Sequence, residues 1–355
     1  MKILILGGTG AIGSHLSQIL VDNGHQVYVT SREERQDRQH SISYIKGNAH
    51  DLTFLQSLLQ RKTWDAIVDF MIYSTKEFEQ RANILLDATS QYIYISSSRV
   101  YADTHHPITE DCPRLLDICT DKEYLETDEY ALAKARQENI LVDSRRKNWT
   151  VVRPYITFSE YRLQLSPAEK EYWLYGALKG RTILFSRDLS YRYTTLTYGL
   201  DVACGISALI GETSALGEAF HITSNERYRW STILKTYVDV IEQKTGNRPR
   251  VRLLNSWSPL MGGEEYQVKM DRLYDRYFDN SKIGRFIDVN SFHKTLPTLE
   301  RCMFTFLDIS KFKTVNWELM AAKDRFLREW SDLTDIPDAK RKIRYILIRL
   351  GLISR

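Results

Sequence analysis

The sequence has few cysteines, no long apolar run and no excess of charge of one sign. Its four cysteines, at positions 112, 119, 204 and 302, include no pair at metal-ligand spacing, which favours reduced thiols of a cytoplasmic protein. No apolar run approaches the roughly 18 residues of a membrane span. The first apolar segment ends at Gly7, too early for a secretory signal. We therefore expect a cytoplasmic protein without a metal site.

The charge balance argues against a nucleic-acid partner. The chain has 49 Lys and Arg residues against 45 Asp and Glu, so its formal net charge is only +4. Nucleic-acid-binding domains usually carry a stronger and more clustered basic excess. The basic residues are nevertheless unevenly spread, because residues 340–355 contain six of them and no acidic residue.

Short β-rich runs alternate with helical segments over the first 223 residues of the chain. Strands are expected at 2–6, 25–30, 43–46, 66–69, 92–96, 150–153 and 219–223, and helices at 14–23, 52–60, 76–88, 130–143 and 201–210. This alternation predicts an α/β fold of the Rossmann type, a doubly wound parallel sheet with helices on both faces.

After Pro154 the pattern becomes less regular and richer in aromatic residues. We therefore expect a cofactor-binding domain over 1–160, to which residues 200–224 return. A smaller, mainly helical substrate region should comprise 161–199 and 225–335. Residues 336–355 form a basic amphipathic tail.

A glycine-rich turn separates the first strand from the first helix. Its sequence is Gly7-Gly8-Thr9-Gly10-Ala11-Ile12-Gly13. Glycines in this context permit a tight turn, close approach of the backbone to a pyrophosphate, and close packing of helix on strand. The free N–H groups of the helix N-terminus then attract the phosphates. Cofactor contacts are expected from Gly7, Thr9, Gly10, Ala11, Ile12 and Gly13.

These and further motifs resemble the extended short-chain dehydrogenases/reductases, the branch that includes nucleotide-sugar epimerases and dehydratases. The matching segments are the G-x-x-G-x-x-G turn, Ser96 to Tyr101 (followed by Ala102 where glycine is usual), Tyr130 to Lys134, Arg153-Pro154, Asp201-Val202-Ala203 and Asp279 to Lys282. They occur in the family's order and cover roughly residues 1–300. The resemblance implies a nicotinamide cofactor and a nucleotide-sugar substrate.

Tyr130 and Lys134 are the expected catalytic pair. Residues four apart share one face of a helix, so the two side chains project together. A free tyrosine has a pKa near 10, and a neighbouring ammonium favours its phenolate. The resemblance implies that Lys134 also binds the cofactor ribose, and that Ser97 holds the reacting substrate oxygen. Ser96 and Ser98 are rivals, since an alignment error of one residue would exchange them.

The end of the second strand bears on the choice of cofactor. NAD-binding members place an acidic residue there for the ribose hydroxyl, whereas this chain has Ser31 and Arg32. A guanidinium suits a 2′-phosphate, so we expect NADP, with NAD as the alternative. The Asp51-Leu52 pair resembles the family's adenine contact, although Asp51 is equally suited to cap the next helix.

The resemblance implies hydride transfer at a sugar carbon, with Tyr130 as acid and base. The family's 4,6-dehydratases carry an acid pair after the serine, where this chain has Ser98 and Arg99. Dehydration is therefore disfavoured, and ketoreductase and epimerase remain. Two alternatives stay open: a catalytically silent cofactor-binding sensor or RNA-associated protein of this fold, and a reductase of a non-sugar ketone.

Two further regions yield weaker hypotheses. Candidate contacts for a nucleotide diphosphate, or alternatively ordinary surface residues, are Tyr161, Arg192, Tyr193 and Arg227. In the tail, helical spacing predicts one apolar side made of Ile343, Ile346, Leu347 and Leu350. We expect this side to pack on the domain or on a second subunit of a homodimer; the alternative is contact with an anionic membrane surface.

Overall fold

The computed structural model describes residues 1–35 and 41–355 and divides the chain into two compact units. The first unit comprises 1–158, 195–227 and 276–295. The second comprises 159–194, 228–275 and 296–355. Residues 276–295 thus belong to the first unit, although the sequence analysis assigned them to the substrate region. The Arg276 guanidinium fastens this segment by donating to the carbonyls of Tyr101, at 2.9 Å, and Ala102, at 3.0 Å.

The first unit is built on a seven-stranded parallel sheet of order β13-β6-β5-β4-β1-β2-β3. The strands are β1 (Lys2–Leu6), β2 (Gln26–Ser31), β3 (Ile42–Lys46), β4 (Trp64–Asp69), β5 (Thr89–Ile95), β6 (Trp149–Pro154) and β13 (Glu218–Ile222). Strand β1 lies between β2 and β4, with Ile3 opposite Val27 on one side and Ala66 on the other. The predicted Rossmann-type fold is confirmed.

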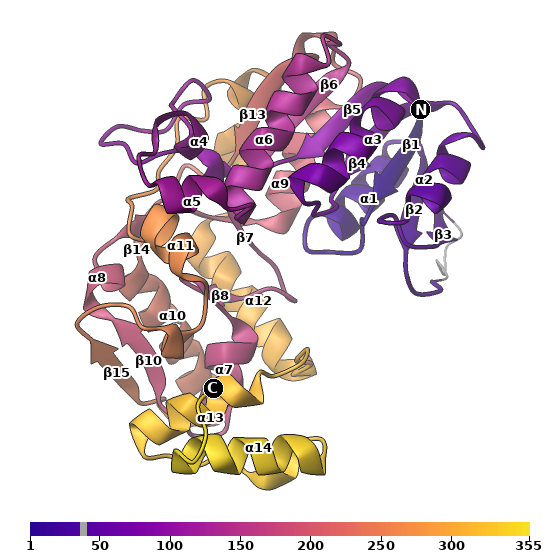
Figure 1. The fold of residues 1–355 in the computed structure, drawn as a ribbon. Helices are drawn as coiled ribbons and strands as arrows, with labels where there is room; N and C mark the ends of the chain where they lie inside the picture. The colour runs from indigo at the N-terminus through magenta and orange to yellow at the C-terminus, as the bar shows by residue number, and fades with distance from the viewer. Residues whose placement is uncertain (36–40) are drawn as a thin grey trace. The chain divides into compact units, whose positions relative to one another are not determined.

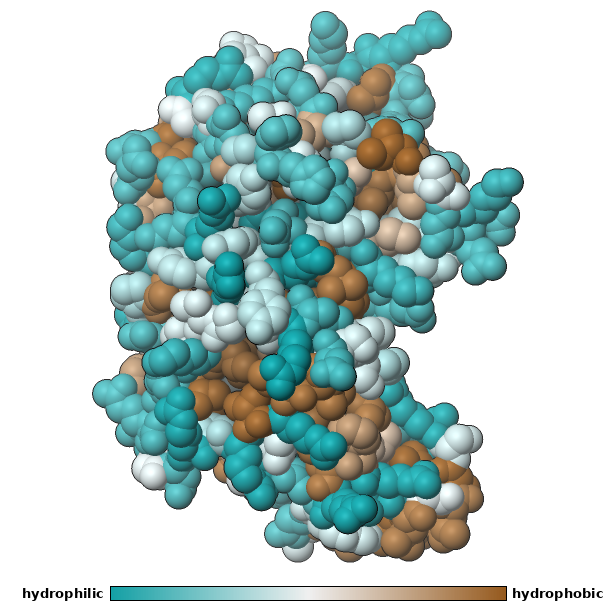
Figure 2. Space-filling model, turned by 90° about the vertical axis from the view of Figure 1, so that its left-hand side faces the viewer, coloured by the Kyte–Doolittle hydropathy of each residue, from teal (hydrophilic) through white to brown (hydrophobic). Residues whose placement is uncertain are grey.

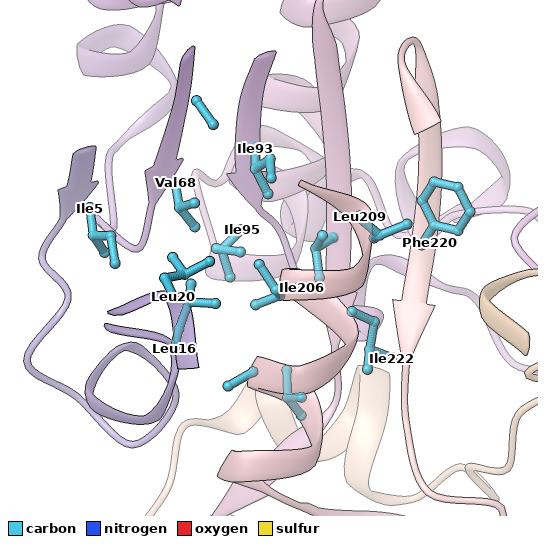
Figure 3. Packing of buried hydrophobic residues seen from close by; sticks show 14 of the residues in the cluster. Ile5, Leu16, Leu20, Val68, Ile93, Ile95, Ile206, Leu209, Phe220 and Ile222 are labelled. Atoms are coloured by element: carbon cyan, nitrogen blue, oxygen red, sulfur yellow. The ribbon is translucent and has the colours of Figure 1, made fainter. Parts of the chain in front are cut away.

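Helices cover both faces of this sheet (Figure 1). The main ones are α1 (Gly13–Asp22), α2 (Leu52–Leu59), α3 (Thr75–Asp87), α6 (Tyr130–Asp143) and α9 (Gly199–Leu209). Alternate strand residues enter two cores, because successive side chains point to opposite faces. Figure 3 shows one core, where Ile5, Val68 and Ile93 of the sheet face Leu16 of α1 and Ile206 of α9.

The connection between β5 and α6 contains short helices that pack within the first unit. They are η1 (Ser98–Val100), α4 (Leu115–Ile118) and α5 (Lys122–Glu126). A parallel pair formed by β7 (Ile156–Phe158) and β12 (Leu196–Tyr198), with η2 (Thr213–Ala215), η5 (Ile283–Arg285) and η6 (Val289–Ser291), completes the unit.

The second unit is mainly helical. Its helices are α7 (Lys170–Leu178), α8 (Arg187–Ser190), α10 (Trp230–Thr245), η3 (Pro259–Met261), α11 (Glu265–Gln267), η4 (Val268–Arg272), α12 (Thr295–Ile309), α13 (Trp317–Leu327), η7 (Leu333–Asp335) and α14 (Ala339–Leu350). Its strands form the pairs β8 (Gln164–Leu165) with β9 (Ala168–Glu169), β10 (Ile183–Ser186) with β15 (Val251–Leu254), and β11 (Tyr193–Thr194) with β14 (Tyr228–Arg229). Among the described residues, no helix is long and apolar enough to cross a bilayer.

Helix α14 packs on α13, mainly through residues outside the predicted apolar side. Tyr345 and Ile348 are buried, whereas Ile343 is 58% and Leu350 54% exposed. The predicted side was therefore wrong except for Ile346, which packs against this core. Tyr345 decides the orientation, because its ring enters the core while its hydroxyl donates to the buried Asp324 carboxylate at 2.8 Å.

Candidate active site

Several residues of the candidate site, both predicted and not predicted from the sequence, lie at the carboxyl ends of the strands of the first unit. Gly7 follows β1, Ser31 ends β2, Asp69 ends β4 and Ser97 follows β5. The chain leaves β1 in one direction towards β2 and later returns on its other side as β4. Open α/β sheets bind ligands at the carboxyl edge beside such a reversal of strand order.

The glycine turn is tightly packed at its base and open at its tip. Gly7 has a positive φ of 69°, and a Cβ on Gly13 would lie 2.6 Å from the backbone of Gly8. Neither position can accept a side chain without displacing its neighbours. Gly10, by contrast, is exposed, and a Cβ placed there would have no other atom within 4 Å. The tip therefore offers bare backbone to a ligand.

The start of α1 suits an anion. Its N-cap, Ile12, makes no side-chain hydrogen bond to the first N–H groups of the helix, although the Ser14 N–H donates to the Gly10 carbonyl at 3.2 Å. A helix start without a capping side chain favours an anion. The turn before it is fixed by Thr30, whose hydroxyl accepts from the Gly7 N–H at 3.0 Å. A Cβ on Gly199 would lie 2.3 Å from the Ala11 carbonyl, so the start of α9 packs closely against the glycine turn at Ala11.

At the end of β2, Ser31 is buried and Arg32 is exposed. The Ser31 carbonyl accepts from the Gly47 N–H at 2.9 Å, which ties β2 to the end of β3. Of the two acids that follow, Glu34 forms an exposed ion pair with Lys46 at 3.5 Å. The charge of Glu34 is thus paired with that of Lys46. The charged residue directly after Ser31 is Arg32.

Asp51 caps α2, as one of its two interpretations predicts. Its Oδ1 accepts from the N–H groups of Thr53, at 2.9 Å, and Phe54, at 3.2 Å. Leu52 is partly buried. The capping bonds use one carboxylate oxygen, so an adenine contact at the second oxygen stays a prediction.

The three neighbouring serines have different partners. Ser96 donates to the Glu138 carboxylate at 2.6 Å, and Ser98 donates to the Arg153 carbonyl at 2.7 Å. The Ser97 oxygen instead accepts from the Arg99 N–H at 3.2 Å. A hydroxyl that accepts keeps its proton for another partner. This difference favours Ser97 as the substrate-facing serine.

Tyr130 begins α6, is partly buried and lies near two cations. The Lys134 ammonium lies 5.9 Å and the Arg99 guanidinium carbon 5.2 Å from the centre of its ring. A neighbouring ammonium favours a negative phenolate oxygen over a neutral phenol, whereas the charge of Arg99 is offset by its ion pair with Glu129. The structure therefore brings Tyr130 and Lys134 together, as predicted, and adds Arg99.

Lys134 is fully buried at the carboxyl end of β5. Its ammonium donates to the Ile95 carbonyl at 2.8 Å and lies 4.5 Å from the centre of the Tyr94 ring. Burial lowers the pKa of Lys134 to about 8, although the Asp69 and Glu138 carboxylates favour its charged form. An ammonium has three donors, so two remain for a ligand such as a ribose.

Two acids of this site were not predicted from the sequence. Asp69 is buried and accepts from the Tyr92 hydroxyl at 2.8 Å, and burial raises its pKa. Glu129 forms an ion pair with Arg99 and accepts from the Ala131 N–H at 2.8 Å. Each acid had a signal in the sequence by which it could have been found. Asp69 ends an apolar strand, and Glu129 directly precedes a helix.

A buried network fixes α6 behind the site. Burial alone would raise the pKa of Glu138, but Arg153 and Ser96 hold it below its usual value. The Arg153 guanidinium donates to Glu138 at 2.7 and 2.9 Å and to the Tyr101 hydroxyl at 3.0 Å. The Arg153-Pro154 motif therefore acts through Glu138, which lies one turn beyond Lys134.

Residues 3–222 match the family model of the NAD dependent epimerase/dehydratase family. The match covers more than half of the chain. The chain belongs to this family. The resemblance to extended short-chain dehydrogenases/reductases is confirmed.

Curated relatives of this epimerase/dehydratase are matched over part of their length. The Arabidopsis thaliana chloroplast stem-loop binding protein of 41 kDa b is 30% identical over 244 residues, which are 64% of this chain and 59% of that protein. The UDP-glucose 4-epimerase of Lactobacillus helveticus is 28% identical over 134 residues, 32% of this chain and 41% of the relative.

Solved structures share the fold. The UDP-glucuronic acid 4-epimerase of Bacillus cereus, in complex with UDP-glucuronic acid and NAD, is 16% identical and has a TM-score of 0.63 over 88% of this chain and 100% of its own. The UDP-glucose 4-epimerase of Bifidobacterium longum, with NAD+ and UDP, is 18% identical with a TM-score of 0.64 over 87% and 98%. Identities this low establish the fold alone.

The predicted nucleotide contacts of this epimerase/dehydratase are divided between the units. Tyr161, Arg192 and Tyr193 belong to the second unit, and Arg227 to the first. The Arg227 guanidinium lies 4.3 Å from the centre of the Tyr277 ring. Their role in binding a nucleotide stays a prediction. Within 1–35 and 41–355, no group of three or more His, Cys, Asp or Glu residues is placed to hold a metal ion.

Proposed function

We propose that this chain binds a nicotinamide dinucleotide at the glycine turn and acts on a hydroxyl-bearing carbon of a nucleotide-linked sugar. One observation supports this most strongly: Tyr130 lies near Lys134 and Arg99 in the same unit as a bare glycine tip, at a helix start without a side-chain cap. A bound nicotinamide would accept or return a hydride. The remaining chemistry belongs to the chain's own side chains.

Tyr130 is the proposed acid and base. Its phenolate takes the proton of the substrate hydroxyl as the C–H bond opens, and returns it when the carbonyl is reduced. Lys134 stabilises the phenolate by its charge, and Ser97 donates to the same substrate oxygen. The N–H groups of Gly10 to Gly13 hold the pyrophosphate.

Arg99 limits which reaction of the family this chain can be proposed to catalyse. It occupies a position where the family's 4,6-dehydratases carry an acid, and its guanidinium is held by Glu129. Glu129 is in turn fixed by the Tyr124 hydroxyl at 3.0 Å and by the Ala131 N–H. A guanidinium cannot act as the acid and base of water elimination. Epimerisation or ketone reduction is therefore favoured over dehydration.

For the cofactor we propose NADP, on the basis of Ser31 and the exposed Arg32. The compared epimerase structures from Bacillus cereus and Bifidobacterium longum contain NAD, so NAD is the alternative. NADP and NAD are both nicotinamide dinucleotides, so the proposal of such a cofactor does not depend on the choice between them.

The test is a direct assay. UDP-glucose and UDP-glucuronic acid are incubated with the protein and either NAD+ or NADP+, and 4-epimers are sought by chromatography. In parallel, oxidation of NADPH is followed with a 4-keto sugar nucleotide. Turnover that is lost in Tyr130→Phe and kept in the control Tyr191→Phe, at a tyrosine that is 63% exposed and has no proposed role, supports the proposal. Cofactor binding without turnover on any sugar nucleotide or simple ketone would favour a silent sensor.

A second candidate function rests on the Arabidopsis relative, whose name describes stem-loop binding. That relative shows the highest identity of the three curated matches, 30% over 244 residues. Stem-loop binding by this chain would be measured as retardation of a labelled RNA stem-loop against an unpaired RNA of the same composition. Equal or absent retardation of both RNAs would dismiss it.

A further inference from the structure

The side of α14 that faces away from α13 carries an apolar stripe. Ile343, Leu347 and Leu350 follow one another at spacings of four and three residues, which places them on one side of the helix. Tyr345 and Ile348, which enter the core of the second unit, lie on the opposite side. Ile343 and Leu350 are both more than half exposed.

Two further exposed apolar residues follow the helix in the chain. A left-handed turn at Gly351 ends α14, and Leu352 (67% exposed) and Ile353 (37%) follow it. Figure 2 shows apolar side chains gathered over the part of the second unit where α13 and α14 lie in Figure 1. We define the α14 stripe as Ile343, Leu347, Leu350, Leu352 and Ile353.

The polar residues of the helix are all basic or neutral. Lys340 is exposed one turn before Ile343, and α14 contains four further basic residues and no acidic one. Arg344 pairs with Glu318 of α13, and Arg341 with the N-cap Asp338. The stripe is therefore flanked by positive charge on a helix that α13 already holds in place.

The chemistry of this surface selects its partner. A second copy of the same surface would bring like charges together. The helix is also only about 18 Å long, so a stripe about 10 Å wide falls well short of the roughly 800 Å² per partner of a stable dimer. A bilayer rich in anionic lipid complements both the positive charge and the apolar side chains of this surface. Its headgroups attract the cations, and the boundary of its acyl chains accommodates the aliphatic side chains.

We propose that α14 docks the protein on anionic phospholipid bilayers, with the α14 stripe inserted at the boundary between headgroups and acyl chains. Tyr345 and Ile348 keep the helix on α13 during docking. The helix is folded beforehand, so binding does not have to order it. This proposal is independent of the reaction proposed for Tyr130.

The experiment is flotation of the full chain with two kinds of vesicle, one of phosphatidylcholine with phosphatidylglycerol and one of phosphatidylcholine alone. The stripe variant is Ile343→Ser with Leu350→Ser. Its matched control is Ile118→Ser with Val142→Ser, which removes two aliphatic side chains that are 54% and 57% exposed in the first unit. Equal melting temperatures of the two double variants would show that both are folded.

We expect the protein and the control to float with the anionic vesicles only, and to be released at high salt. The stripe variant should bind the anionic vesicles at least tenfold more weakly, and Lys340→Gln should weaken binding by a smaller factor. Absence of flotation, equal binding to both kinds of vesicle, or equal binding by stripe variant and control would each overturn the proposal. A stripe variant that splits a dimer while no form binds vesicles would identify a second copy as the partner.

Discussion

Each of the two units contains a deeply buried lysine whose pKa is lowered by burial, and these two lysines are electrostatically alike. Lys134 in the first unit and Lys323 in the second are both buried, and burial lowers the pKa of each to about 8. Each ammonium donates to a backbone carbonyl, that of Ile95 at 2.8 Å or that of Tyr172 at 3.0 Å. A shifted pKa by itself therefore does not distinguish a site from a core.

Their surroundings differ. Lys134 follows a partly exposed tyrosine by one helical turn, at the carboxyl edge of a parallel sheet. Lys323 lies near the guanidinium of Arg181 and the carboxylate of Asp324, which are themselves buried. The Asp324 carboxylate is occupied by the Ser331 and Tyr345 hydroxyls, at 2.6 and 2.8 Å. The comparison teaches that a perturbed charge marks a candidate site when its neighbour is a partly exposed, proton-carrying side chain such as Tyr130, and not when its neighbours are a buried ion pair.

The largest effect is expected for Tyr130→Phe. Removing the phenolic oxygen deletes the group that moves the substrate proton, so turnover should fall about 10²- to 10⁴-fold. Affinity for the cofactor, measured by fluorescence titration, should change little because the ring is kept. Near-normal turnover in this variant would remove Tyr130 from the mechanism.

Replacing each buried lysine by methionine separates their roles. Lys134→Met should reduce turnover about 100-fold, since it removes a cation that stabilises the phenolate and a cofactor contact. Lys323→Met should leave turnover per folded molecule unchanged. Steady-state kinetics on both variants checks this, and equal losses of turnover would refute the distinction.

The same pair predicts a dependence of stability on pH. Between about pH 8 and pH 10.5 the unfolded state binds more protons than the folded state at each lysine, so each contribution to the free energy of unfolding rises with pH. Below pH 8 the cost of the buried charge is present in full, on the order of a few kcal/mol for each lysine. Relative to the parent, Lys323→Met should therefore gain most at pH 7 and progressively less towards pH 10.5. Urea unfolding at these pH values measures the difference in the free energy of unfolding between the variant and the parent. A difference that is the same at all pH values would contradict the assigned titration of Lys323.

The smallest effect is expected for an exposed cation. If Arg32 contacts a 2′-phosphate, the parent should bind NADPH about tenfold tighter than NADH, and Arg32→Ala should abolish the difference, costing about 1–3 kcal/mol. Calorimetric titration of both cofactors checks this, with the exposed Arg35→Ala as control. Equal affinities in the parent protein would refute the interpretation of Ser31 and Arg32.

Most of the first unit could be predicted, because its central strands are buried on both faces and are followed by turn or helix signals. The predicted second strand at 25–30, for example, differs from β2 by one residue at each end. The pairing of Tyr130 with Lys134 also followed from helical spacing alone. In the second unit the strands are two to four residues long, too short for a periodic pattern to be detected.

By itself, the sequence determined the order of the βαβ units, the glycine turn and the one-turn spacing of Tyr130 and Lys134, because these depend on contacts between residues close in the chain. Only the tertiary structure decided which serine hydroxyl remained available, that Arg99 and Glu129 lie beside Tyr130, and which side of α14 is buried. Those outcomes depend on partners distant in the chain, such as Glu138 for Ser96 and Asp324 for Tyr345. Local periodicity cannot encode them, since the free energy that selects one side of a helix comes from the surface it meets.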